Sequence, residues 1–327
     1  PGAFQHVAIF EDRAEIEFAV ARRVVEIDDH RGAVFERHAA HFAQGGGEPG
    51  VGPPQARRDD GGEAEIVRRM RIGQLQGGLM SVVGLRDIEP SIAALQNLPL
   101  LFRSWEEIDY VRDKMRAGME KRFLDKGFVV IGWGDAGWVR FFSKEAAFSP
   151  GDFKSRKFFA WGSEPEQQAI MKSLGYTPVP LETGDALSAI QTGMIDVLPS
   201  TPYFALASQV FGTAKHMLDI NWAPIVGALV VTQKAWDAMT PAGQDALRKA
   251  GEKAGLAMRA QARKEVDEAV SAMQKRGLTV NRPNEAQMRE WNALAEQLYP
   301  RIRGAMVPAD TFDEVFVHLR AYRAGKR

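Results

Sequence analysis

Short apolar runs alternate with amphipathic stretches between residues 127 and 203, and this alternation organises the chain. Apolar runs bounded by glycine or proline predict buried strands, whereas apolar residues at every third or fourth position predict helices. The expected strands are 127–132, 157–161, 177–181 and 194–198, and the expected helices are 164–174 and 185–192. Strands alternating with short helices predict an open α/β sheet, whose ligands bind beyond the carboxyl ends of the strands.

Large aromatic side chains lie where these predicted strands end. Each ring taken alone is explained by packing in the core, and for Trp161 core packing is the favoured explanation. Taken together, the rings predict a ligand pocket. The four are Trp133, Trp138, Trp161 and Tyr203.

The pattern outside this stretch predicts longer helices and a chain that returns on itself. Ser104 and Glu107 form a capping-box pattern that opens a helix reaching residue 126, interpreted as scaffold. Runs 216–220 and 227–232 predict strands that return to a first lobe, so the chain crosses between two lobes more than once. The longest helix is expected at 239–277, followed by a short strand at 278–280 and by helices that Asn284 opens.

Composition narrows the class of protein. The chain has 327 residues, enough for two domains, with 45% hydrophobic and 26% charged residues, as in soluble globular proteins. Lysine plus arginine and aspartate plus glutamate number 42 each, which argues against nucleic acid as the partner. The absence of cysteine excludes disulfides and thiol chemistry. No apolar run reaches the ~18 residues of a membrane span, and Pro1 opens no signal-peptide pattern, so export cannot be inferred from the sequence.

The sequence predicts neither catalysis nor a cofactor. It contains no G-x-S-x-G elbow, H-E-x-x-H pair or nucleotide-binding loop. A hydrolase that pairs the carboxylates of Asp135 and Glu182 is the enzyme alternative. His38 and His41 are the only close histidine pair, and their spacing matches no standard metal site, so no metal is expected.

Several motifs occur together in a characteristic order. QTGMID follows LGYTPVPL and a strand that begins FKSRKF; MRIGQLQGG, LPLLFRSWEE and a WGDAG turn precede them. Across about residues 63–300 the chain resembles the solute-binding proteins of TRAP (tripartite ATP-independent periplasmic) transporters of the dicarboxylate type. The resemblance implies a two-lobed α/β clamshell, like periplasmic binding proteins, with hinge-crossing strands and a long lobe-spanning helix. It also implies a periplasmic protein without a cofactor, which closes on a small-molecule ligand and delivers it to the TRAP membrane permease; the alternative is a ligand-sensing module.

The resemblance also divides the chain. Residues 63–126 and 215–250 are expected to form lobe I, residues 127–214 lobe II, and residues 251–327 helices that pack across both lobes. Residues 1–62 do not fit the family pattern. They are interpreted either as an aberrant reading frame or as a divergent extension, and a third possibility is that they replace part of lobe I and abolish binding.

Arg140 is the leading candidate for contact with an acidic ligand. Its planar guanidinium matches the two oxygens of a carboxylate. The alternative is an ion pair with a nearby carboxylate such as Asp135. The arginine that the family often places here aligns with Val139, so Arg140 is expected on the opposite face of its strand.

The resemblance further implies that a ligand clamp has been lost. In the family, a strand reading K-I-R-V carries an arginine that binds the ligand carboxylate, and Phe159 stands at that position here. The pocket is therefore expected to be apolar, and the ligand to be an amphipathic or apolar-bodied organic acid. Hydroxyl groups at Ser200 and Thr201 either bind the ligand or cap the next helix. The other predicted contacts are Trp133, Asp135, Trp138, Phe159, Trp161, Glu182, Tyr203, Gln76 and Gly77.

Overall fold

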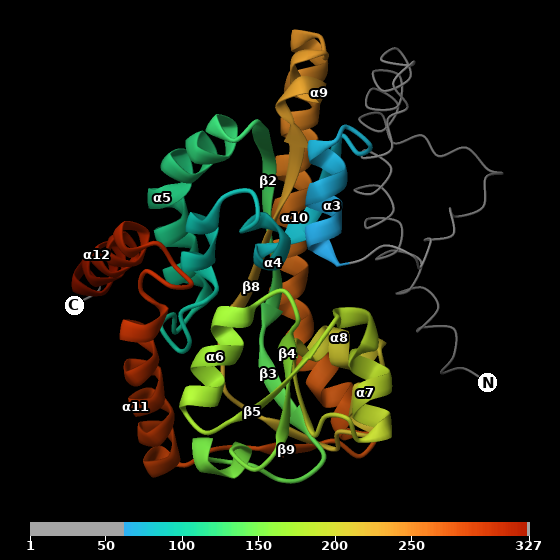
Figure 1. Ribbon diagram of the computed structural model, residues 1–327, viewed down its shortest axis with the longest axis vertical. Coiled ribbons are helices and arrows are strands. Elements are labelled where there is room, and N and C mark those ends of the chain that lie inside the picture. Colours follow the sequence, from blue (N-terminus) through green and yellow to red (C-terminus); the bar gives the residue numbers. More distant parts are fainter. Residues whose placement is uncertain (1–61, 326–327) are drawn as a thin grey trace, which may run out of the picture. The chain divides into compact units, whose positions relative to one another are not determined.

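The computed structural model describes residues 62–325, and these form two compact units (Figure 1). The first comprises the described part of Pro1–Ile88 with Glu120–Gly134 and Gly227–Met258. The second comprises Glu89–Met119, Asp135–Val226 and Arg259–Arg327, as far as it is described. Four elements therefore contribute residues to both units: α5 (Trp105–Asp125), β2 (Phe128–Trp138), β8 (Pro224–Thr232) and α10 (Pro241–Gln274). None of the described helices is both long and apolar enough to cross a membrane.

The first unit is built on a three-stranded sheet in the order β1-β8-β2, with β1 (Gly77–Ser81) antiparallel to β8. Val129 and Ile131 pack with Leu229 and Val231 on one side of this sheet, together with Trp236. The remaining helices of this unit are α3 (Glu63–Arg71), α4 (Val82–Leu85) and α9 (Gln233–Asp237).

Helix α10 lies directly against strand β2 in the first unit. A Cβ atom on Gly251 would meet Ile131 Cγ2 at 2.3 Å, and one on Gly255 would meet the Trp133 carbonyl oxygen at 2.2 Å. Only glycine permits this approach of helix to strand backbone. The two glycines are four residues apart and therefore lie on the same face of the helix.

The second unit is built on a six-stranded sheet in the order β5-β4-β6-β3-β7-β9. Strand β3 runs antiparallel to β6 and β7, whereas β4 runs parallel to β5 and β6, and β7 parallel to β9. The strands are β3 (Arg140–Ser143), β4 (Lys157–Trp161), β5 (Thr177–Leu181), β6 (Val197–Ser200), β7 (His216–Leu218) and β9 (Thr279–Asn281).

Both faces of this sheet are buried: successive side chains of a strand point to opposite sides, and each side packs in its own core cluster. Phe142 and Phe159 pack on one face with Met273 of α10. Phe141 and Phe158 pack on the other face in a separate cluster of aromatic rings. The helical segments of this unit are η1 (Pro90–Leu95), η2 (Pro150–Phe153), α6 (Pro165–Ser173), η3 (Thr183–Asp185), α7 (Ala186–Thr192), α8 (Pro202–Ala207), η4 (Val210–Gly212), α11 (Glu285–Ile302) and α12 (Ala309–Gly325).

Most of the predicted elements are confirmed. Strand β4 and strand β5 have the predicted bounds, helix α10 is the longest of the described helices, and Asn284 caps α11 in a capping box with Gln287. Gly193 closes α7 in the left-handed conformation, with φ of 79°. The expected strand at 194–198 begins three residues late, at Val197.

Three local predictions are wrong. The WGDAG segment forms no turn, because β2 continues through it to Trp138, with Gly137 accommodating a φ of 109°. Trp133 therefore lies inside a strand rather than at its end. Strand β7 pairs with β3 and β9 in the second unit instead of returning to a first lobe. At the start of α5, Glu107 accepts a hydrogen bond from the Arg103 amide, one residue before the position that a capping box uses.

The interpretation of residues 1–62 concerns a segment outside the described residues, apart from Gly62, which precedes α3. The predicted lobe boundaries remain a prediction beside the two units given above.

Candidate functional site

The carboxyl ends of β4, β5 and β6 meet the start of β3 at one edge of the six-stranded sheet. The parallel pairing aligns Trp161 with Leu181, and the antiparallel pairing aligns Arg140 with Ser200. In open α/β sheets this edge is where ligands bind. It gathers half of the predicted contacts, which are Arg140, Trp161, Glu182, Ser200, Thr201 and Tyr203.

Arg140 lies on the face of the sheet that it shares with Phe142, whereas Val139 is buried in the cluster on the opposite face. The Arg140 guanidinium forms an ion pair with Asp219 and donates a 3.0 Å hydrogen bond to Asn221 Oδ1. Arg140 thus forms an ion pair, with Asp219 and not with the suggested Asp135, and its contact with a ligand remains a prediction. Strand β7 ends at Leu218 opposite Phe141, and the next residue, Asp219, consequently comes to face Arg140.

The charges around Arg140 balance within the second unit. Arg282 Nε lies 3.3 Å from Asp219 Oδ2, so two arginines share this aspartate. Burial lowers the pKa of Arg140, and the negative charge of Asp267 on α10 opposes that shift. Arg140 Nε is buried without a partner among the described residues. The charges of these two arginines and two aspartates thus balance, and they leave no excess positive charge around Arg140.

The apolar wall of the edge comes from strand β4. Phe159 is buried in the core and contacts Trp161 edge-on, with ring centroids 5.3 Å apart. Trp161 is half-buried at the end of its strand, so its ring combines core packing with an accessible surface. The position where the family resemblance places an arginine is thus filled by a core side chain.

The hydroxyl groups at the end of β6 make local hydrogen bonds. Thr201 Oγ1 accepts from the Phe204 amide at 3.3 Å and caps α8, as one of the two alternatives predicted. Ser200 Oγ donates to the Thr201 carbonyl oxygen at 3.3 Å. Tyr203 is 43% exposed, and Glu182 is exposed.

Three predicted contacts belong to the first unit. The buried Trp133 donates from its indole Nε1 to Glu120 Oε1 at 2.9 Å. A side chain at Gly77 would collide with the Val230 carbonyl oxygen, at 2.8 Å, so this glycine serves strand pairing. Gln76 Nε2 donates to the Gly73 carbonyl oxygen at 3.2 Å. The common pocket of four aromatic rings remains a prediction.

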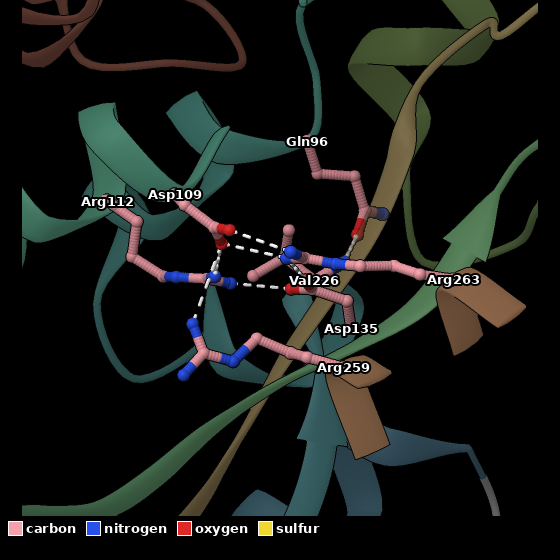
Figure 2. A network of polar contacts seen from close by, with 7 residues as sticks. All are labelled: Gln96, Asp109, Arg112, Asp135, Val226, Arg259 and Arg263. Atoms are coloured by element: carbon pink, nitrogen blue, oxygen red, sulfur yellow. Dashed lines mark hydrogen bonds and ion pairs between the residues drawn. The ribbon is translucent and has the colours of Figure 1, made fainter. Parts of the chain in front are cut away.

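Asp135 has a different setting from the one expected. Its carboxylate is fully buried and accepts from Arg112 at 2.5 Å and from Arg263 at 3.0 Å (Figure 2). Asp109 joins the same group, since it pairs with Arg112 and accepts two hydrogen bonds from Arg263. Both Asp135 oxygens are therefore engaged in an ion network rather than directed at a ligand.

This Arg–Asp network comprises Asp109, Arg112, Asp135, Arg259 and Arg263, and it holds α5, β2 and α10 together within the second unit (Figure 2). Nearby, Gln96 Oε1 accepts from the Val226 amide at 3.1 Å. Arg263 also lies over the Trp105 ring, 5.0 Å from its centroid. Trp105 in turn contacts Trp138, with the ring centroids 4.8 Å apart.

The network shifts the ionisation of its members. Burial raises the pKa of Asp109, but the hydrogen bond from Arg263 and the surrounding arginine charges outweigh burial and leave that pKa below its usual value. The hydrogen bond to Asp109 raises the pKa of Arg263. Burial and repulsion by Arg112 lower the pKa of Arg259.

Sequence reasoning missed four members of the network, although a signal was present. Arg112 occupies an inward position of α5, one turn after Ile108 and beside Val111. Arg259 and Arg263 are four residues apart on one face of α10. A charge at an apolar position of a helix predicts a buried partner. Within residues 62–325, no group of three or more acidic or histidine side chains is arranged to hold a metal ion.

Comparison with known proteins places this chain in a family. The model of a family described as bacterial extracellular solute-binding protein, family 7 (DctP) matches residues 59–304. The C4-dicarboxylate-binding periplasmic protein DctP of Rhodobacter capsulatus is 24% identical over 250 residues, which cover 76% of this chain and 73% of that protein.

Solved structures show the same fold. DctP7 of Bordetella pertussis, an extracytoplasmic solute receptor binding pyroglutamic acid, matches with a TM-score of 0.71 at 20% identity, over 79% of this chain and 84% of that one. A TRAP periplasmic solute-binding protein from Xanthobacter autotrophicus, with bound β-D-galacturonate, matches with a TM-score of 0.74 at 18% identity, over 88% and 94%. The predicted two-lobed α/β fold is thereby confirmed.

Proposed function

The chain belongs to the bacterial extracellular solute-binding proteins of family 7, and from this premise we propose that it binds an apolar-bodied monocarboxylic acid in the periplasm and delivers it to a TRAP-type permease. Family 7 membership confirms the resemblance read from the sequence motifs. It supports an extracytoplasmic binding role, with a small organic acid as the solute.

The observation that carries the ligand class is the charge balance around Arg140. Asp219 already neutralises this arginine, and Phe159 puts a core side chain at the position where the family resemblance implies an arginine that clamps the ligand carboxylate. A dicarboxylate would bring two negative charges to an edge with no excess positive charge. A monocarboxylate needs only one partner, and the exposed part of Trp161 offers an apolar surface for its body.

Ligands of related proteins agree with this choice. Pyroglutamic acid and galacturonate, the compounds bound to the two structural relatives above, each carry a single carboxyl group, although the rest of each molecule is polar. The Rhodobacter capsulatus relative instead binds C4-dicarboxylates. Family membership therefore does not decide between monocarboxylates and dicarboxylates. In this proposal the ligand class is inferred from the ion pair of Arg140 with Asp219.

The proposal is tested on the full chain. Native mass spectrometry first identifies any molecule that copurifies, and isothermal titration then compares phenylacetate and 3-methylbutanoate with succinate and malate. We expect the monocarboxylates to bind at least about tenfold more tightly, a difference of about 1.4 kcal/mol. Tighter binding of succinate or malate would contradict the proposed ligand class while leaving the binding role intact.

Catalysis is not part of the proposed function. A hydrolase based on Asp135 and Glu182 needs a carboxylate free to act on a substrate, and Asp135 is buried with both oxygens engaged. The sensing alternative shares the same binding step. It is distinguished by whether solute uptake in the host depends on both this chain and a TRAP permease.

A further inference from the structure

The Arg–Asp network carries one more positive charge than negative charge. Its cations are Arg112, Arg259 and Arg263, and its anions are Asp109 and Asp135 (Figure 2). A charge that is buried without a partner is costly. The network therefore lacks one anion.

The contacts show which arginine is left over. Arg112 and Arg263 use both oxygens of Asp135, and both also pair with Asp109. Arg259 Nη1 lies 3.5 Å from Asp109 Oδ1, an oxygen that already accepts from the two other arginines. Among the described residues Arg259 makes no hydrogen bond, so its guanidinium has donors to spare.

Burial makes the unmatched charge of Arg259 significant. Its Nε is buried without a partner among residues 62–325, while the side chain as a whole is 21% exposed. The guanidinium is thus partly desolvated, yet open enough for a small ion to reach it. Arg263 is held in place beside it by Asp109 and by the Trp105 ring.

We propose that Arg259 anchors a binding site for one small carboxylate anion on the second unit, distinct from the sheet edge that carries Arg140. The planar fork of a guanidinium matches the two oxygens of a carboxylate. The missing charge is a single one, and the neighbouring Asp109 carboxylate disfavours a doubly charged anion such as sulfate. The site lies on α10 beside α5, and its existence does not depend on the proposed function.

The test uses the full chain and acetate as the probe. The melting temperature is followed while sodium acetate replaces sodium chloride at constant ionic strength, in the wild type, in Arg259→Gln and in Lys264→Gln. Lys264 is an exposed cation on the same helix, so its variant controls for the loss of one positive charge. We expect a saturable rise in melting temperature in the wild type and in Lys264→Gln, and none in Arg259→Gln.

A further readout distinguishes an anion site at Arg259 from a purely structural role of this residue. In acetate-free chloride buffer, Arg259→Gln is expected to melt no lower than the wild type, because the substitution removes an unmatched charge. A clearly lower melting temperature would identify Arg259 as a structural partner of Asp109 and overturn the proposal. An undiminished acetate response in Arg259→Gln, or an exchange of chloride for acetate without effect in the wild type, would also overturn it.

The same titration in Arg140→Ala locates the bound acetate. A response equal to that of the wild type supports a site on α10 that is separate from the sheet edge. A response lost in Arg140→Ala but kept in Arg259→Gln would place the acetate at the sheet edge and refute the inference, without refuting the proposed binding of an organic acid there.

Discussion

Arg112 and Asp135 form an ion pair of 2.5 Å in the interior of the second unit, with side chains 1% and 0% exposed. Arg112 belongs to a helix and Asp135 to a strand, 23 residues further along the chain. The pair fixes α5 against β2 through two charges that water does not reach. Its stability depends on both partners, because either charge alone would remain buried and uncompensated.

We therefore predict that Asp135→Asn lowers the free energy of unfolding by about 3–5 kcal/mol, the usual cost of removing one partner of a buried pair. Urea unfolding followed by tryptophan fluorescence measures the change. Asp245→Asn, which removes one partner of the exposed pair with Lys249, is the control and should cost less than about 1 kcal/mol. Equal effects of the two substitutions would show that the Arg112–Asp135 pair contributes little to the free energy of unfolding.

The lowered pKa of Asp109 predicts that the folded protein loses stability in acid. Its pKa is lowered in the folded protein from an ordinary value of 3.8, so the unfolded chain takes up a proton before the folded one does. The stabilisation is complete above the unfolded pKa and is lost as the pH falls from about 5 through 3.8 to the lower folded pKa.

Urea unfolding between pH 7 and pH 3 tests this sign. Asp109→Asn should be less stable than the wild type at pH 7 and should lose less stability between pH 5 and pH 3. Asp237→Asn, at an exposed position, controls for the removal of one negative charge. An acid slope in Asp109→Asn as steep as that of the wild type would assign the effect to other carboxylates.

Several strands and helices of the second unit could be predicted from local patterns, and the ion network could not. The apolar run 158–161 lies between Lys157 and Gly162, so it identifies β4 directly. Strand β2 is harder to predict, because it contains three glycines. A Cβ atom on Gly132 would meet the Gly251 carbonyl oxygen of α10 at 2.3 Å, and Gly137 has a positive φ. Glycines usually indicate turns, and this explains the wrong prediction for WGDAG.

Pairing between distant residues lies beyond what a single sequence specifies. The partner of Arg140 follows from the register of β3 with β7, which are separated by more than 70 residues in the chain. A shift of one residue in that register would have placed Leu218 or Ile220 opposite Arg140 instead of Asp219. The presence of a charged residue in an apolar strand could be read from the sequence, but its counter-ion could not.

The close contact between α10 and β2 predicts that a side chain added at Gly255 destabilises the protein. Gly255→Ala would place a methyl group 2.2 Å from the Trp133 carbonyl oxygen, so helix and strand must separate. Overpacking of this kind costs about 1–3 kcal/mol, which exceeds the gain of about 1 kcal/mol that alanine offers in a helix interior. Chemical denaturation should show a net loss.

Gly325→Ala is the matched control, because a Cβ atom there would meet nothing within 4 Å. It should leave the free energy of unfolding within about 0.5 kcal/mol of the wild type. If Gly255→Ala stabilises the protein as much as its helix propensity allows, α10 does not lie as close to β2 as the distances state.

Asp219 supplies the last prediction, which concerns ligand choice. In the proposed function, the ligand carboxylate and the Asp219 carboxylate compete for the guanidinium of Arg140, because the guanidinium cannot pair equally with both at the same time. Asp219→Asn keeps the size of the side chain and removes its charge. We expect this variant to bind phenylacetate about tenfold more tightly, a gain of about 1.4 kcal/mol, and to improve succinate binding by a larger factor, because a dianion gains more from the lost repulsion.

Isothermal titration of both acids against the wild type, Asp219→Asn and Arg140→Ala measures these effects. Arg140→Ala should weaken both acids, since the cation that attracts them is gone. Asp313→Asn, at an exposed pair with Arg303 on the same unit, controls for the change in net charge and should leave both affinities unchanged. If Asp219→Asn weakens phenylacetate binding instead, Asp219 orients Arg140 for the ligand. The proposal that the two carboxylates compete for Arg140 is then wrong.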